Sequence, residues 1–416
     1  MTTYYVSTSG NDSNSGTSTS SPWRNIQRAA NIVSAGDIVY VRGGTYYEQV
    51  RISRSGSSTG YITFQPYTGE SVTIDVNSKV PKWEGGVYIT NCGYIQFIGF
   101  NVVNSYWCGI WVHTCNNVII KGCTVHAIQR SGLYAQNSSY ITYDGNNVYN
   151  TQIAGFGSGN DQQNENVNMI NVSNFEIKNN YIHDTDNFES IDVKQGGGNG
   201  TIHHNTVVAN MSAGIYIDSQ GQSMSYIDTY NNYVTGGGYG VRGIAYAVEV
   251  SGSLQHCKIY NNILNKTGAA GIVASTSYSV GTISDIVVVN NTVYNCGLDT
   301  DWGGGIRIEY GSATGIIVRN NISYNNSGSG GNLMPNGNTT QDHNLIGTNP
   351  NFVNPSTADF HLQSNSPAIN AGSSTQFVPG FDYDNKTRPQ GSAYDIGALE
   401  YVTAGCPTLS ISLSVQ

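Results

Sequence analysis

Two short segments of the chain carry charged groups at a spacing that would let those groups act together. Ile191-Asp-Val-Lys194 and Ile215-Tyr-Ile-Asp218 repeat one pattern of apolar and polar residues, 24 residues apart. Side chains alternate across a β-strand, so two strands with inward isoleucine and valine would direct Asp192, Lys194 and Asp218 to the outer surface. Only 11% of the residues are charged, so this concentration of ionisable groups indicates chemistry rather than solubility.

These residues fit two reactions. Lys194 would serve as a base if an adjacent cation lowered its pKa. Alternatively, Asp192 and Asp218 would lie about 8 Å apart by strand dimensions. That separation falls within the roughly 6.5 to 9.5 Å of inverting glycosidases, and Lys194 would then keep one carboxylate ionised. A third interpretation is a salt-bridge ladder on a non-catalytic glycan-binding or tailspike-like protein.

A repeat places these segments in the fold. Inward strand starts recur every 23 to 24 residues, with about ten residues inserted three times, and each repeat carries a second strand that ends in an Asn pair or its equivalent. Stacked coils that share one buried core have this signature. We therefore expect an all-β protein, a right-handed single-stranded parallel β-helix with an N-terminal capping helix and an irregular C-terminal cap. The inward starts are Val87, Ile110, Leu133, Val167, Ile191, Ile215, Val248, Ile272 and Ile306.

The same reading predicts four segments. Residues 1–80 form an N-terminal cap and first coils, with a helix from about Trp23 to Val33 capped by Ser20 or Ser21. Residues 81–326 are the regular coils, and residues 327–403 are the C-terminal coils and cap. Residues 404–416 begin a truncated linker or module.

The composition narrows the partners and the location. A net charge of −9 and a pI near 5.3 speak against nucleic acid, and no run of 18 apolar residues predicts a membrane helix. We expect a secreted monomer whose leader is not part of this sequence. Seven cysteines cannot all pair. Cys92 and Cys115 would stack in neighbouring coils, either as a disulfide or as buried thiols.

Aligning the first strand of each coil gives outward columns beside the charged residues. Lys194, Asp218 and Glu249 would form one vertical ladder, with Asp192 next to it. Insertions at 151–165, 236–246 and 297–304 would wall this surface into a cleft, and flat aromatic rings beside carboxylates suit a sugar chain. The candidate substrate-binding residues are Trp111, His113, Tyr134, Tyr216, Arg307 and Glu309.

Several segments of the sequence resemble those of a known superfamily. Tyr4-Tyr-Val-Ser-Thr-Ser-Gly-Asn-Asp, Gly36-Asp-Ile-Val-Tyr-Val-Arg-Gly-Gly-Thr-Tyr, the Asn-Asn coils and Asp395-Ile-Gly-Ala-Leu-Glu-Tyr together resemble secreted right-handed parallel β-helix proteins of the pectate-lyase superfamily. Ser190-Ile-Asp-Val-Lys194-Gln-Gly is similar to the strand of family 9 polysaccharide lyases whose outward lysine acts as base.

The resemblance implies β-elimination on an extracellular, uronate-containing polysaccharide, without an organic cofactor. Lys194 would remove the C5 proton of a uronate, with Ca²⁺ held nearby by carboxylates. In this chain the turn before Lys194 offers Asp184, Asp186 and Glu189, and an oxygen cage of this kind suits Ca²⁺. The preceding coil offers Asp161 and Glu165.

Overall fold

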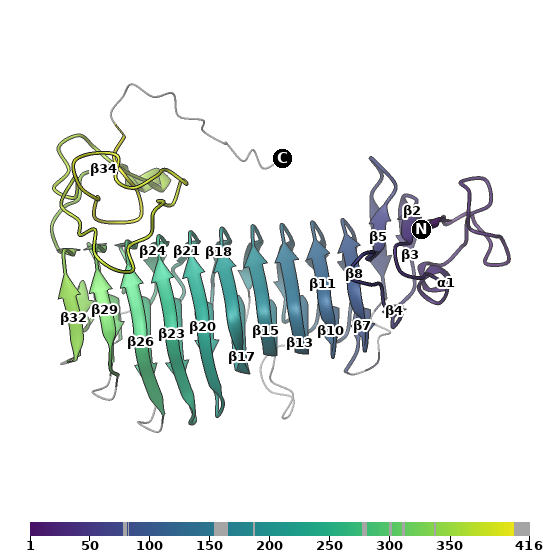
Figure 1. Cartoon of the computed structure of the whole chain (residues 1–416), viewed down its shortest axis with the longest axis horizontal. Helices are drawn as coiled ribbons and strands as arrows, with labels where there is room; N and C mark the ends of the chain where they lie inside the picture. Colours follow the sequence, from purple (N-terminus) through teal and green to yellow (C-terminus); the bar gives the residue numbers. More distant parts are fainter. Residues whose placement is uncertain are drawn as a thin grey trace.

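The chain winds into a long stack of parallel coils in the computed structural model, which describes residues 1–77, 81, 83–153, 165–185, 188–276, 281–298, 302–309, 313–336 and 338–402. The N-terminus lies at one end of the stack, and residues 351–402 fold over one side at the other end (Figure 1). Nearly every strand pairs with the equivalent strand one coil away, in parallel. The parallel β-helix expected from the repeat is confirmed. Among the described residues, no helix has the length and apolar character needed to cross a membrane.

The coils present three strand faces. The first face is the outer side of β4 (Val50–Ile52), β7 (Gly85–Thr90), β10 (Cys108–His113), β13 (Leu133–Asp144), β15 (Val167–Lys178), β17 (Ile191–His203), β19 (Ala213–Asp218), β22 (Arg242–Val248), β25 (Ala270–Thr276), β28 (Gly304–Ile308) and β31 (Leu333–Met334). Three of these strands, β13, β15 and β17, are long enough to bend onto the second face.

The second face is built from β1 (Thr3–Val6), β2 (Ile38–Val41), β5 (Ile62–Pro66), β8 (Gly93–Ile98), β11 (Asn116–Lys121), the ends of β13, β15 and β17, then β20 (Ser223–Tyr230), β23 (Ser253–Tyr260), β26 (Thr282–Val289), β29 (Ile316–Arg319) and β32 (Thr339–Asp342).

The third face holds β3 (Gly44–Tyr46), β6 (Val72–Asp75), β9 (Asn101–Val103), β12 (Thr124–His126), β14 (Asn147–Thr151), β16 (Tyr181–Thr185), β18 (Thr206–Val208), β21 (Tyr233–Gly236), β24 (Ile263–Thr267), β27 (Thr292–Tyr294), β30 (Ile322–Tyr324) and β33 (Leu345–Ile346).

Alternation within the strands forms the core. Ile191, Val193, Ile215 and Ile217 point inward and are fully buried, as the apolar and polar pattern predicts. Successive coils stack these side chains, so each coil buries its apolar side only against its neighbours.

One asparagine from each of eight coils, in most of them the second residue of the Asn pair, forms a ladder at the bend between the second and third faces. Its Oδ1 accepts hydrogen bonds of 2.9–3.0 Å from both the backbone N–H and the Nδ2 of the equivalent Asn one coil earlier. Fully buried amides are tolerated here because each is satisfied by the next. The ladder runs through Asn146, Asn180, Asn205, Asn232, Asn262, Asn291, Asn321 and Asn344.

The first residue of the pair has a left-handed backbone, with φ of 51° at Asn231 and 54° at Asn320. Its side chain turns outward to the C-terminal cap. Asn261 Nδ2 donates to the carbonyl of Phe381, and Asn290 Nδ2 donates to the carbonyls of Asp395 and Gly397. The cap also carries the antiparallel pair β34 (Phe352–Asn354) and β35 (Asp359–Leu362), with the 3-10 helix η2 (Pro355–Thr357) between them.

The cap is closed by an ion pair between Arg388 and Glu400, whose side chains are both fully buried. Arg388 Nη2 also donates to Asn261 Oδ1. The cap is therefore tied to the same Asn pairs that stack the coils.

Two sequence expectations need correction, the N-terminal helix and the inward residue of one coil. The N-terminal helix is shorter than predicted, since α1 spans Ile26–Ala30 with Asn25 at its N-cap rather than Ser20 or Ser21. The inward partner of Ile215 is Ile244, not Val248. Residues 243–248 are almost wholly apolar, so their pattern does not show which of them point into the core. In the structure Tyr246 points inward, and its hydroxyl is hydrogen-bonded to that of Thr229.

The cysteine pair is a stack of thiols. Cys92 and Cys115 lie 3.9 Å apart between their sulfur atoms and are both free. The predicted segment 404–416 lies outside the described residues.

The amide ladder predicts a large loss of stability on Asn262→Ala. This change leaves the backbone N–H and Nδ2 of Asn232 and the carbonyl of Thr229 without their partner in a buried bend. We expect the free energy of unfolding to fall by about 3 kcal/mol or more, measured by denaturant unfolding. The exposed Asn116→Ala serves as control and should change it by less than about 0.5 kcal/mol. An equal effect in both variants would contradict a stabilising ladder.

Candidate functional site

Lys194 lies on the first face, held between two carboxylates. Its Nζ is 2.6 Å from Asp192 Oδ2 and also donates to Glu165 Oε1. The lysine side chain is only 9% exposed. Burial alone would lower the pKa of Lys194, but the charges of Asp192 and Glu165 outweigh burial and hold it well above its usual value. In this state Lys194 is an ammonium ion.

A third carboxylate joins this cluster. Glu165, Glu189 and Asp192 each offer an oxygen within 4.8 Å of the others. Burial, together with the neighbouring Glu165, raises the pKa of Glu189, and burial raises that of Asp192 further. Three buried carboxylates share one ammonium, so the cluster has a surplus of two negative charges when fully ionised.

Two buried oxygens beside the cluster, Asp192 Oδ1 and Asn168 Oδ1, have no hydrogen-bond partner among the residues that the structure describes. Asn168 pairs with Asp192 in the strand register, and its Nδ2 donates to Glu165. Unpartnered buried oxygens are costly unless something supplies positive charge or a donor. Carboxylate and amide oxygens are the ligands that Ca²⁺ takes. The residues present therefore fit a divalent cation by donor type and by charge.

Asp218 lies directly opposite Lys194 on the next coil. Burial, with a smaller contribution from Glu249, raises the pKa of Asp218 to about 7. Its Oδ1 accepts a hydrogen bond from the backbone N–H of Gln220. A carboxyl group with this pKa is partly protonated near neutral pH and can give or take a proton there.

Glu249 does not continue the predicted ladder. Asp218 pairs with Ala247, so Glu249 lies two residues beyond the column. The cause is the expected inward position of Val248, because the structure places Ile244 beside Ile215 instead. Glu249 nevertheless stays near the site, because it accepts a hydrogen bond from the Tyr216 hydroxyl, while Arg242 packs over the Tyr216 ring at 5.2 Å.

The predicted aromatic residues lie on the first face, but they pack against one another. Trp111 is 4% exposed and its ring stands 5.1 Å from those of both Tyr88 and Tyr134. His113 accepts from or donates to the Tyr88 hydroxyl through Nδ1, and burial lowers the pKa of His113. Tyr216 is equally buried. The rings form a packed wall beside the charged cluster rather than an open platform.

Arg307 and Glu309 form a buried ion pair further along the stack. Arg307 Nη2 lies 2.6 Å from Glu309 Oε1, and its Nη1 donates to the Gly303 carbonyl. The guanidinium also packs over Trp302. In the structure these two candidate substrate-binding residues are therefore paired with each other.

The predicted metal residues are divided. Glu189 belongs to the acidic cluster, whereas the Asp184 side chain is 71% exposed and pairs with His183. Asp184 lies on β16 of the third face, so it does not reach Lys194. Asp186 lies outside the described residues. Glu165 and Asn168 lie in the cluster instead, with Glu165 among its three carboxylates and Asn168 bonded to Glu165. Their signal in the sequence was position, since both flank the strand start at Val167.

Two family models match the chain. Residues 4–167 match the "Pel9A-like, right handed beta helix region", and residues 167–349 match the "Right handed beta helix region". Among curated proteins, pectate lyase PEL9 of Emericella nidulans is 27% identical over 148 residues, which cover 32% of this chain and 36% of that protein. The uncharacterized protein YwoF of Bacillus subtilis is 28% identical over 152 residues, which cover 35% of this chain and 28% of that protein. The matched region thus spans about a third of these relatives.

Solved structures share the fold over almost the whole chain. Pectate lyase Pel9A is 19% identical with a TM-score of 0.61, and the match covers 97% of both chains. XylC in complex with xylose is 13% identical with a TM-score of 0.55, covering 96% of this chain and 99% of that one. From the family models and the solved structures, we conclude that the chain is a right-handed parallel β-helix protein, and that its residues 4–167 are similar to the Pel9A-like family.

Proposed function

We propose that the protein cleaves an extracellular, uronate-containing polysaccharide by β-elimination, with Lys194 as the base. The observation that carries this proposal is a lysine buried among three carboxylates whose charge it only partly balances. The likeness to pectate lyase PEL9 and to the Pel9A-like family supports it. The substrate is a polysaccharide, and the protein acts as a secreted monomer without an organic cofactor.

The state of Lys194 decides whether it can accept a proton. With both ion pairs in place it is protonated, and a protonated lysine is no base. Glu165, Glu189 and Asp192, with the Asn168 amide oxygen, would hold Ca²⁺. When bound, the ion would neutralise the substrate carboxylate and offset the negative charge around Lys194, which lowers the pKa of this lysine.

Lys194 and Asp218 then carry out the two proton transfers of the elimination. Lys194 takes the C5 proton of the uronate, and the bond from C4 to the leaving oxygen breaks as the double bond forms between C4 and C5. Asp218, opposite Lys194 and partly protonated near pH 7, is placed to return a proton to the leaving oxygen. The unsaturated ring is then the new non-reducing end of one of the two products.

Lys194→Ala should remove the base. We expect elimination to fall by about 10³-fold or more, followed as ultraviolet absorbance of the unsaturated product on polygalacturonate. Lys178→Ala is the matched control, since Lys178 also pairs with a carboxylate, that of Glu176. It should retain full activity. Full elimination activity in the Lys194 variant would contradict the proposal.

Chelation should abolish elimination, and added Ca²⁺ should restore it. Glu189→Gln removes one ligand charge without removing Lys194's direct partners, so we expect its calcium affinity to fall about 10-fold or more, measured by isothermal titration calorimetry. Asp184→Asn, at the exposed predicted position, should bind Ca²⁺ as the unaltered protein does. Equal calcium affinity in the Glu189 variant and the unaltered protein would argue against this ligand set.

Inverting hydrolysis by Asp192 and Asp218 is the second candidate, favoured by the raised pKa of Asp218. In that case reducing ends would appear without ultraviolet absorbance, and chelation would have no effect. Asp192→Asn and Asp218→Asn would each be more damaging than Lys194→Ala.

The pKa of Asp218 also predicts a pH dependence of stability. Its pKa is about 7 in the folded state and about 3.9 when unfolded, so the folded protein binds this proton more tightly. The contribution of Asp218 to stability is therefore fully present below about pH 4 and is lost as the pH rises to about 7. Asp218→Asn should be more stable than the unaltered protein at pH 8, measured by denaturant unfolding at pH 5 and 8.

Asp342→Asn provides the opposite case. The bond to Arg319 lowers the pKa of Asp342, so the ionised form stabilises the fold and this variant should be less stable at pH 8. A loss of stability in both variants at that pH would show that Asp218 is not strained by its burial.

A further inference from the structure

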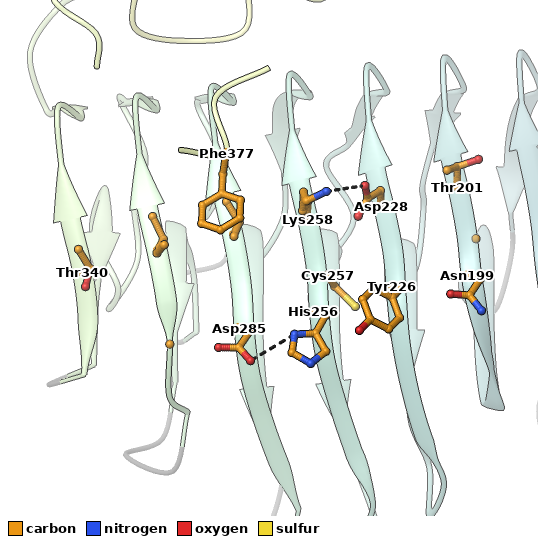
Figure 2. Close-up of a pocket in the computed structure, with 14 residues that line it drawn as sticks. Asn199, Thr201, Tyr226, Asp228, His256, Cys257, Lys258, Asp285, Thr340 and Phe377 are labelled. Atoms are coloured by element: carbon orange, nitrogen blue, oxygen red, sulfur yellow. Dashed lines mark hydrogen bonds and ion pairs between the residues drawn. The ribbon is translucent and has the colours of Figure 1, made fainter. Parts of the chain in front are cut away.

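A groove of about 800 Å³ crosses the second face, away from Lys194. It runs over β17, β20, β23, β26, β29 and β32, and Phe377 of the C-terminal cap stands over one side (Figure 2). Its volume lies within the roughly 300–1,000 Å³ of ligand sites. The groove spans about five strand spacings, or roughly 24 Å along the stack.

One column of residues along this face has a left-handed backbone in nine consecutive coils. Short polar residues or glycine adopt this conformation at little cost, and several coils use them. Two coils within the groove instead use large rings, Tyr226 with φ of 56° and His256 with φ of 57°. Strained positions of this kind persist at functional sites. The column contains Tyr94, Asn117, Tyr140, Asn174, Asn199, Tyr226, His256, Asp285 and Gly315.

The two rings form an accessible surface for a sugar. Tyr226 stacks on His256 with 5.2 Å between ring centroids and stays 56% exposed. His256 covers one face of the tyrosine ring, and the register neighbour on the other side, Asn199, is a shorter side chain. Phe377 is 40% exposed. This contrasts with Trp111 and Tyr216 of the first face, which are almost fully covered.

The groove has no excess of positive charge. Lys258 lies 3.3 Å from Asp228, and His256 Nδ1 lies 3.3 Å from Asp285 (Figure 2). The lining thus holds two carboxylates beside one lysine, which disfavours a polyanion. Asn199, Thr201 and Thr340 add groups that hydrogen bond to hydroxyls.

We propose that this groove binds an extended strand of a neutral polysaccharide, stacked on Tyr226 and Phe377. The site is separate from the first face and needs no catalysis. The protein would then hold a neutral glycan on the second face while a uronate polymer reaches Lys194 on the first.

Tyr226→Asn tests this site without disturbing the fold. Asparagine is the residue that the same column uses at Asn174 and Asn199, so the change relieves the backbone and removes the ring. We expect a higher melting temperature together with at least a tenfold weaker affinity for xylohexaose or cellohexaose, measured by calorimetry. Tyr140→Asn is the matched control, because Tyr140 has the same φ and the same 56% exposure but lies outside the groove. It should keep the affinity.

Three further measurements separate the two sites. Phe377→Ala should also weaken neutral binding at least tenfold, whereas Lys194→Ala should leave it unchanged. Hexagalacturonate should not compete for the groove. The proposal is overturned if the unaltered protein binds neither neutral probe, if Tyr226→Asn binds as well as the Tyr140 variant, or if hexagalacturonate competes equally. Elimination by Lys194 does not depend on any of these results.

Discussion

The stacked amides at the bend between the second and third faces are the constraint on which the rest of the structure depends. Each Asn must place its oxygen toward two N–H groups of the previous coil, and only one rotation of each coil about the stack achieves this. The ladder therefore fixes the phase of every coil. Insertions before the first-face strands do not propagate, because the next Asn restores the phase. The first-face residues are held in register by this ladder on the opposite side of the core.

Register alone brings the charged groups together. Lys194 and Asp218 are opposite each other because their strands pair residue by residue, and Asn168 reaches Asp192 for the same reason. The surplus of negative charge around Lys194 follows from this stacking, since carboxylates from two consecutive coils meet in a space that excludes water. Such an arrangement is unfavourable for the folded protein, and burial together with the neighbouring carboxylates raises the pKa values of Glu189 and Asp192. Sites of this kind trade stability for chemistry.

The sequence predicted what depends on period and alternation. The coils, the inward side chains around Ile191 and Ile215, and the pairing of Lys194 with Asp218 follow from those two patterns. The error at Val248 arose because the residues around it do not alternate between apolar and polar side chains. In such an apolar run the strand can be aligned two residues away from its true position and still match the expected pattern. Burial of Trp111 and recruitment of Glu165 could not be predicted, because both depend on how side chains from several coils fill space. The strand register gives which residues are neighbours, but it does not give how far their side chains are buried.

The ties between the C-terminal cap and the Asn pairs determine the order in which the protein can fold. Asn231, Asn261, Asn290 and Asn320 each bond to the cap, and they come from four different coils. The cap can find this row of amides only after those coils have stacked. Arg388 has no adequate solvation in its buried place until Glu400 and Asn261 surround it together. The cap therefore docks after these four coils, and it closes over a stack that has already formed.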